Sequence, residues 1–375
     1  MKIIHLLPSL NQYGGTPKKT YDLCVLSQFC HEILCTSEWG DKSVNDSGAE
    51  KFKNAGVKVT RWNHTGALGE IKQVVNLISK LWYLKADVVH CYFDRGIVLG
   101  SIIKLLCPSS KIMLSCVGQR EQSGFFKKIL LNISLRRFDG VIFVSNYVRL
   151  SWSSIFPILE EVDTKVIANG TSRRLSLEKV PNVQGHPALL TIGGLNEHKN
   201  LEVLVQAMSV IRKNGRLNPV LRIAGDGPLK VKLRMLIRKL GLENNIEILG
   251  YTEDVGSLLR DADLYVHPAV SEGFGIAVIE AMRSGTAVIV SNMGALPEIV
   301  RNGVDGIVVD YSDPSAWTSA IEFILSDTIF RRKIAAEGYI SSRRNFGVSA
   351  FVNKHDNYYL DICNLARDKP TASNL

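Results

Sequence analysis

The sequence alternates short apolar runs with segments of helical periodicity, and this alternation strongly constrains the fold. Apolar runs of strand length in the first half are Lys2–Leu7, Phe29–Thr36, Val57–Trp62, Asp87–Tyr92, Lys111–Cys116, Gly140–Val144 and Lys165–Ala168. Helical patterns such as Thr16–Gln28 and Gly69–Leu84 fall between some of them. This order predicts an α/β fold, in which crossover helices cover a parallel sheet. Ligands of such sheets bind beyond the carboxyl ends of the strands.

The second half repeats the pattern, and the whole chain of 375 residues has the length of two ordinary domains. Its expected strands are Ala188–Ile192, Val220–Ala224, Ile246–Leu249, Leu264–His267 and Ala287–Ser291. A polar stretch with Pro181 and Gly185 separates the halves. We therefore predict a first domain over residues 1–170, a linker over 171–185 and a second domain over 186–345.

Charge is unevenly placed along the chain. Residues 1–180 contain 24 Lys and Arg against 15 Asp and Glu, whereas residues 181–375 contain 21 of each. The whole net charge of +9 therefore belongs to the first half. A basic first domain predicts an anionic partner, which could be membrane lipid, nucleic acid or a phosphorylated acceptor.

The sequence also bears on the compartment. No apolar run reaches the roughly 18–20 residues that span a bilayer. The opening residues contain one Lys and an apolar run broken by Pro8, which indicates a first strand rather than a signal peptide. Seven cysteines without metal-ligand spacing suggest buried free thiols in a reducing compartment. We therefore expect a cytoplasmic protein.

The stretch Gly124–Phe138 mixes apolar bulk with two basic pairs, Lys127-Lys128 and Arg136-Arg137. A basic amphipathic helix of this kind can lie on an anionic membrane surface. The plainer alternative is a core helix whose basic side chains are solvated. Under the first alternative the protein is peripheral on the inner face of the membrane, held there by its basic N-terminal domain.

The stretch Leu264–Arg283 carries the clearest functional pattern. Pro268 closes the apolar strand Leu264–His267, because proline cannot continue a strand ladder. A turn with two glycines, Gly273–Gly275, then leads into a helix that begins at Ile276. The first N–H groups of a helix and its dipole together form an anion site suited to phosphate.

Two carboxylates, Glu272 and Glu280, bracket this turn. Acids beside a phosphate repel it, so their partners are expected to be neutral donors such as sugar hydroxyls. Glu280 sits in an apolar setting, where an unpaired charge is costly. The plainer alternative pairs Glu280 with Arg283 along the helix and leaves Glu272 solvated near the helix N-terminus.

Glu272 and Glu280, with seven residues between them and Gly-Phe-Gly after the first, resemble the E-x7-E motif of retaining glycosyltransferases of the GT-B fold, family 4. The resemblance implies that Glu272 contacts the donor sugar and that Glu280 holds the ribose hydroxyls. It also implies that backbone after the first glutamate contacts sugar and phosphate, here Gly273, Phe274, Gly275 and Ile276.

The resemblance covers nearly the whole chain and is specific over residues 188–310. It implies two Rossmann-like domains facing across a cleft, with the acceptor on residues 1–170 and the nucleotide sugar on residues 186–345. A C-terminal helix within residues 346–367 would cross back to the first domain.

Three further donor-side positions follow from the resemblance. Gly14 and Gly15 match the family's first glycine-rich loop, which faces the donor phosphates; the plainer reading is an ordinary strand-to-helix turn. Lys199 matches the diphosphate-binding lysine and would assist catalysis together with Glu272. Relatives commonly have an arginine where this chain has Gly194, so one phosphate-binding cation is missing or comes from elsewhere.

On the acceptor side, His90, Asp94 and Arg120 follow strand ends in the first half and are the candidates. Each alone is more often a structural polar residue. Many relatives carry a histidine where this chain has Val117, which puts a histidine-assisted mechanism at that position in doubt.

Asp261-Ala262-Asp263 spells a DxD metal motif, but in this family that slot is a structural connection, so we expect no metal and no cofactor. The prediction is a retaining hexosyltransferase that moves a sugar from a nucleotide-diphosphate sugar, preferably UDP-linked, to a saccharide or lipid-linked saccharide. Cell-surface polysaccharide biosynthesis is the expected setting.

Three alternatives stay open. One is a sugar-nucleotide epimerase of the same fold, which would need no acceptor. Another is a non-catalytic anion-binding module, but no nucleic-acid motif supports a nucleic-acid partner. The third is an inactive homologue, suggested by Val117 and Gly194.

Overall fold

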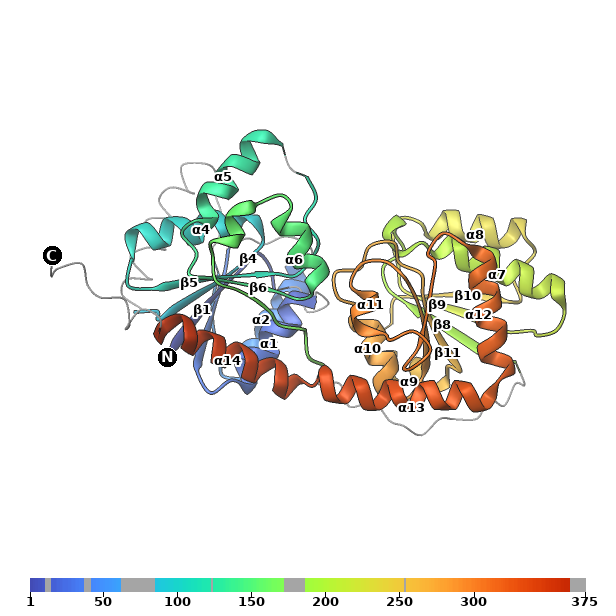
Figure 1. Ribbon diagram of the computed structural model, residues 1–375. Helices are drawn as coiled ribbons and strands as arrows, with labels where there is room; N and C mark the ends of the chain where they lie inside the picture. The colour runs from blue at the N-terminus through green and yellow to red at the C-terminus, as the bar shows by residue number, and fades with distance from the viewer. Residues whose placement is uncertain are drawn as a thin grey trace. The chain divides into compact units, whose positions relative to one another are not determined.

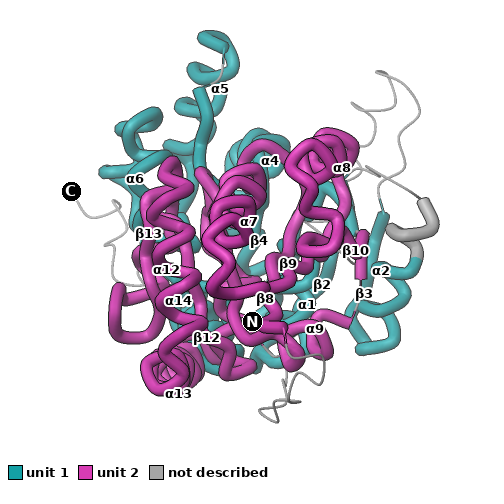
Figure 2. Tube along the Cα trace, turned by 90° about the vertical axis from the view of Figure 1, so that its right-hand side faces the viewer, with its two compact units in different colours: residues 1–170, 348–375 teal, residues 171–347 magenta. Residues whose placement is uncertain are grey.

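The computed structural model describes residues 1–10, 15–36, 42–61, 85–122, 124–171, 186–252 and 254–364. The chain divides into two compact units, which Figure 2 shows in different colours. Unit 1 comprises residues 1–170 and 348–375, and unit 2 comprises residues 171–347. The predicted linker, residues 171–185, lies outside the described residues except for Thr171.

The sheet of unit 1 has the strand order β3-β2-β1-β4-β5-β6-β7, and all its pairings are parallel. The strands are β1 (Lys2–Leu7), β2 (Cys30–Cys35), β3 (Lys58–Arg61), β4 (Val88–Tyr92), β5 (Lys111–Cys116), β6 (Gly140–Phe143) and β7 (Thr164–Val166). The helices are α1 (Gly15–Leu26), α2 (Lys42–Asn54), α4 (Phe93–Leu106), α5 (Phe125–Leu135), α6 (Asn146–Ser153), the 3-10 helix η1 (Pro157–Glu160) and α14 (Val348–Asn364).

The sheet of unit 2 has the order β10-β9-β8-β11-β12-β13 and is also parallel. Its strands are β8 (Ala188–Ile192), β9 (Val220–Ala224), β10 (Ile246–Gly250), β11 (Leu264–His267), β12 (Ala287–Ser291) and β13 (Ile307–Val309). Its helices are η2 (Glu197–Lys199), α7 (Leu201–Asn214), α8 (Lys230–Lys239), α9 (Val255–Asp261), α10 (Ile276–Arg283), α11 (Leu296–Ile299), α12 (Pro314–Ser326) and α13 (Thr328–Asn345). Helices lie on both faces of each sheet (Figure 1).

The strands predicted from apolar runs are confirmed; half of them have the predicted ends, and the ends of the others shift by one or two residues. The apolar runs in the sequence are easy to recognise because these strands are buried on both faces. Every residue of β4 and β12 is buried, as expected for parallel strands covered by helices on both sides. The predicted helix Gly69–Leu84 lies outside the described residues. β13, α12 and α13 were not among the predicted elements.

Local sequence sets the helix ends. Asp313 caps α12 by accepting the backbone N–H of Ser315, and Pro314 occupies the first turn, where its missing N–H has no consequence. α7 ends at Gly215, whose φ of +65° suits a residue without a Cβ. No helix in the described part of the chain is long and apolar enough to cross a membrane.

α14, which lies within the predicted terminal segment 346–367, completes unit 1. Phe351, Tyr358 and Tyr359 of this helix join residues of β1, β4, β5 and β6 in one hydrophobic cluster. Asp356 accepts hydrogen bonds from the Ser27 hydroxyl (2.6 Å) and the Gln28 N–H (3.2 Å), just after α1. The C-terminal helix therefore covers a sheet that begins with the first residues of the chain.

Four buried histidines meet where α14 covers the sheet: His5, His31 and His90 come from β1, β2 and β4, and His355 comes from α14. His5 Nε2 lies 2.8 Å from His31 Nδ1. His5 also lies beside His90, with ring centroids 5.2 Å apart. Burial is the largest cause that lowers the pKa of each of the four, and neighbouring imidazoles add to it for His5, His31 and His90. We call these residues the histidine cluster.

Candidate functional site

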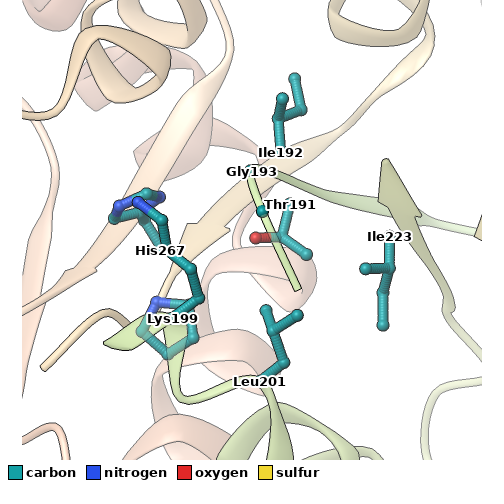
Figure 3. A pocket seen from close by; sticks show the side chains of 9 residues that line it. Thr191, Ile192, Gly193, Lys199, Leu201, Ile223 and His267 are labelled. Atoms are coloured by element: carbon teal, nitrogen blue, oxygen red, sulfur yellow. The ribbon is translucent and has the colours of Figure 1, made fainter. Parts of the chain in front are cut away.

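The candidate site of unit 2 lies where β8 and β11 end. β8 runs into Gly193 and Gly194, and the following turn, η2, carries Lys199. A small pocket at these strand ends is lined by Lys199 and His267, with Thr191 and Ile223 among the other lining residues (Figure 3). A turn and a strand end that are far apart in the sequence therefore bring a cation and an imidazole to one place.

Glu272, in the loop after β11, joins this pair. Its Oε2 accepts from Lys199 Nζ at 2.6 Å and from His267 Nε2 at 3.1 Å. Its Oε1 accepts from the backbone N–H of Gly275 at 3.1 Å and of Phe274 at 3.4 Å. The carboxylate is thus fixed at the start of α10, and the alternative in which Glu272 is simply solvated is wrong.

Glycines allow the close approaches that shape these loops. A Cβ on Gly294 would lie 2.4 Å from the carbonyl oxygen of Glu272, and the neighbouring Ala295 N–H donates to that oxygen at 2.9 Å. A Cβ on Gly193 would lie 3.2 Å from Lys199 Cε. Gly275 has φ +90° at the start of α10, a region that favours glycine. Larger residues at Gly294 would displace the backbone that carries Glu272.

The ionisation states follow from burial and partners. Burial alone would raise the pKa of Glu272, but the hydrogen bond from His267 and the charge of Lys199 outweigh it and hold the pKa well below its usual range. Burial lowers the pKa of His267, and the Lys199 charge adds to this against the opposing hydrogen bond to Glu272. At neutral pH Glu272 is therefore a carboxylate and His267 a neutral imidazole.

The neutral imidazole is oriented from behind by Tyr265. The Tyr265 hydroxyl lies 3.1 Å from His267 Nδ1, and both side chains are buried. Because the Glu272 carboxylate can only accept, the proton of the neutral His267 is assigned to Nε2, and Nδ1 then accepts from the Tyr265 hydroxyl, which also lies 3.5 Å from the carbonyl oxygen of Ile192. Neither residue was a sequence candidate, although their i, i+2 spacing places both side chains on one face of β11.

Glu280, the second acid of the motif, lies on α10 and is 6% exposed. Burial is the main cause that raises the pKa of Tyr265, and the charges of Glu272 and Glu280 both contribute to the same shift. The structure thus brings both motif acids within electrostatic reach of one tyrosine, although only Glu272 lies against Lys199.

Of the three acceptor-side candidates in unit 1, Asp94 and Arg120 contact each other, whereas His90 has other partners. Arg120 pairs with Asp94, and Lys127 Nζ approaches the same carboxylate at 2.7 Å. The Arg120 guanidinium also stacks over Trp152, 5.0 Å from the ring centre. Asp94 is 31% exposed in its side chain, so this ionic group reaches the surface of unit 1.

The acceptor role predicted for His90 is not supported. The side chain is fully buried within the histidine cluster. Its Nδ1 lies 2.8 Å from the Tyr359 hydroxyl and its Nε2 lies 2.7 Å from Ser115 Oγ, so both nitrogens are used internally. Of the first glycine-rich loop, Gly15 is exposed at the start of α1, and Gly14 lies outside the described residues.

The DxD sequence has structural partners. Asp263 Oδ2 accepts a hydrogen bond from the backbone N–H of Ala188 at 2.9 Å and so holds the start of β8. The Asp261 carboxylate oxygen Oδ1 lies 3.9 Å from Arg260 Nε. Within the described ranges, one group of side chains brings three possible metal ligands within 4.8 Å, namely His5, Cys24 and His31 of unit 1. Two of these, His5 and His31, already contact each other through ring nitrogens.

The sequence is similar to those of known glycosyltransferases. The family model described as "Glycosyl transferases group 1" matches residues 172–340. An uncharacterized glycosyltransferase of Methanocaldococcus jannaschii is 30% identical over 271 residues, covering 67% of this chain and 69% of that protein. The UDP-Gal:alpha-D-GlcNAc-diphosphoundecaprenol alpha-1,3-galactosyltransferase of Escherichia coli is 23% identical over 390 aligned residues, covering 96% and 97%.

Solved structures give the same fold. Anabaena HepE in complex with UDP superposes with a TM-score of 0.81 at 18% identity, covering 96% of this chain and all of that one. The UDP-glucose complex of HepE gives the same TM-score at 19% identity. The predicted fold class, two Rossmann-like α/β domains of the GT-B type, is confirmed.

Proposed function

The chain belongs to the group 1 glycosyltransferases, and we propose that within this family it is a retaining enzyme that uses a UDP-sugar as donor. The acceptor we propose is a saccharide or lipid-linked saccharide in cell-surface polysaccharide biosynthesis. The observation that carries the proposal is the 2.6 Å ion pair of Lys199 with Glu272 at the carboxyl ends of β8 and β11. In open α/β sheets this edge is where ligands bind.

The donor contacts are assigned by charge. Lys199 would meet the diphosphate, and the backbone at the start of α10, with Gly273, Phe274, Gly275 and Ile276, would lie against sugar and phosphate. The N–H groups of Phe274 and Gly275 donate to Glu272 Oε1, so these two residues would hold the carboxylate beside the donor. Glu272 would hold sugar hydroxyls and Glu280 the ribose hydroxyls. UDP is favoured because the Escherichia coli relative is named for UDP-Gal and the HepE complexes hold UDP and UDP-glucose.

The proposed reaction proceeds on one face of the sugar. The acceptor oxygen forms a bond to the anomeric carbon on the side from which the diphosphate leaves, and the acceptor proton passes to a phosphate oxygen of the leaving group. Lys199 stabilises the negative charge that grows on the diphosphate as that bond breaks. With this lysine and the α10 N-terminus supplying positive character, the proposed mechanism needs no metal ion or cofactor.

The test first measures which nucleotide sugar binds and then identifies the reaction products. Thermal shift against UDP-glucose, UDP-galactose, UDP-N-acetylglucosamine and GDP-mannose selects the donor, because a ligand of the folded state raises the melting temperature. The selected donor is then incubated with diphosphoundecaprenol-linked saccharides, and the product linkage is read by NMR. An α-donor should give an α-linkage. An inverted linkage, or a new nucleotide sugar formed without acceptor, would contradict the proposal, and the latter would indicate the epimerase.

We also propose that unit 1 attaches to an anionic membrane through α5, where a lipid-linked acceptor would be found. Five apolar side chains of this helix are exposed, among them Phe126 at 85% and Phe125 at 73%. Exposed Lys128 and Arg136 flank them. Each basic residue near an anionic leaflet contributes about 1 kcal/mol, so charge and apolar burial together favour reversible attachment to the cytoplasmic face.

The membrane test uses phosphatidylglycerol vesicles at low salt and the double variant Lys128→Glu with Arg136→Glu. Lys127 is left unchanged because it pairs with Asp94. Vesicle binding should fall at least tenfold in the variant and with added salt. Lys213→Glu, an exposed charge reversal on α7, should bind vesicles like the parent. Equal binding by the double variant and the parent would reject α5 as the attachment surface.

A further inference from the structure

In the structure, Glu272 has more hydrogen-bond partners than it would keep in the proposed donor complex. Its Oε2 accepts from both Lys199 (2.6 Å) and His267 (3.1 Å), while its Oε1 is held by the Gly275 and Phe274 N–H groups. Under the proposed function, Lys199 is also the residue that meets the donor diphosphate. One ammonium group then has two anionic partners to choose between.

The difference in negative charge between the diphosphate and the Glu272 carboxylate decides which of them Lys199 contacts. A diphosphate carries more negative charge than a single carboxylate and presents several acceptor oxygens to a point-charge donor. The flexible stem of Lys199 passes beside Gly193, where the absence of a Cβ leaves room for it to move. Donor binding therefore draws Lys199 from Glu272 toward the phosphates, and Oε2 loses its charged partner.

We propose that His267 is a positioning residue that holds Glu272 after Lys199 has moved to the donor diphosphate. The inference rests on the proposed function of this site. His267 does not touch the donor; it acts through the carboxylate, which it keeps hydrogen-bonded and aimed at the sugar. Tyr265 in turn keeps the proton of His267 on the nitrogen that faces Glu272.

Three features suit His267 to this task. It belongs to a buried strand, β11, and is 1% exposed, so it stays in place when the loops move. The Tyr265 hydroxyl at 3.1 Å from Nδ1 selects the tautomer. A neutral imidazole also does not attract the diphosphate, whereas a second lysine here would compete for it.

The consequence is an asymmetric effect on binding. When His267 is replaced, Lys199 still donates to Glu272 Oε2 in the absence of UDP. With UDP bound, Lys199 has moved to the phosphates, and Glu272 Oε2 has no side-chain donor. Leaving a buried carboxylate oxygen without a partner disfavours the loaded state, so His267→Phe should weaken UDP binding about tenfold. UDP itself is the probe, because it lacks the sugar that Glu272 would contact directly.

A double-mutant cycle measured by calorimetry with UDP tests this. His267→Phe should lose about tenfold in the parent background and less than twofold in a Glu272→Gln background, where no carboxylate depends on the imidazole. Glu272→Gln alone should bind UDP at least as well as the parent, because Lys199 is no longer held back. His267→Gln, which keeps an N–H donor, should stay within about threefold of the parent.

Tyr265→Phe removes only the hydroxyl and keeps the test decisive if His267→Phe does not fold. It should weaken UDP binding about threefold, and this loss should also vanish in the Glu272→Gln background. An equal loss in both backgrounds would make His267 a packing residue and overturn the inference, as would unchanged UDP affinity in both single variants. A parent that binds no UDP would instead reject the proposed donor, and the inference with it.

Discussion

Lowering the pH from 7 to 5 should strongly destabilise unit 1, because the histidine cluster must remain neutral in the folded protein. The ordinary pKa of histidine is 6.5, and burial lowers that of His31 and of His355 to about 4. Burial and neighbouring imidazoles hold the pKa values of His5 and His90 well below 6.5 as well. Below pH 6.5 the unfolded chain therefore binds protons that the folded chain does not.

The sign and size follow from proton linkage. Stability falls as the pH drops through 6.5 and stops falling near the folded pKa values, about 4 for His31 and His355. Each histidine contributes roughly 1.4 kcal/mol per pH unit, or about 2 kcal/mol at pH 5. Four of them remove about 8 kcal/mol, which is comparable to the whole stability of about 5–15 kcal/mol of a typical protein.

The chain offers a probe specific to unit 1. All seven cysteines are free and belong to unit 1, and Cys91 and Cys116 are buried in its sheet. Labelling with a dithiodipyridine, which reacts with thiols in acid, after urea titration at each pH gives the free energy of unfolding of this unit alone. The expected slope between pH 6 and pH 5 is about 5 kcal/mol per pH unit.

Matched variants separate the cluster from other acid effects. His355→Leu should reduce the slope by about 1.4 kcal/mol per pH unit, because one titrating group is lost. His198→Gln replaces an exposed histidine of unit 2 and should leave the slope unchanged. A parent slope below about 2 kcal/mol per pH unit would refute the reasoning, since fewer than two histidines could then be excluded from protonation.

Three further outcomes are expected for the site. Lys199→Ala should lower both donor affinity and kcat, because its charge meets the leaving diphosphate; steady-state kinetics that match the parent would remove it from the mechanism. Glu280→Gln should weaken UDP binding by about 1.5–3 kcal/mol, the contribution of a charge-assisted hydrogen bond, and calorimetry showing unchanged affinity would leave it a structural residue. Transferase activity should persist in EDTA; complete loss that manganese restores would make Asp261 and Asp263 candidates for a metal site.

Sequence reasoning predicted the strands because parallel strands covered on both faces must be apolar throughout. It also predicted the loops at Lys199 and Glu272, since both follow strand ends in one sheet. The structure places these two side chains in contact, whereas their roles toward a donor stay predictions. β13 has only three residues and was not predicted, although β7, which is equally short, was; length alone does not explain the difference.

The burial of a side chain and its contacts with residues far away in the sequence were harder to predict. His90 follows the same strand-end logic as Lys199, but Tyr359 lies 269 residues away in the sequence and covers it. The residues near His90 in the sequence do not indicate that Tyr359 packs over it. Likewise, the alternation of Tyr265 and His267 reveals a shared strand face, but only the folded loop shows that His267 reaches Glu272.

The return of α14 to unit 1 has a consequence for synthesis on the ribosome. Unit 2 is one continuous stretch, residues 171–347, and can fold as soon as it emerges. Unit 1 is translated first yet must wait for its last helix, because Tyr358 and Tyr359 complete the cluster that includes Ile3 and Val88. Until translation has passed the end of α14 at Asn364, the nascent chain carries an uncovered apolar sheet face, which is the kind of surface that chaperones bind.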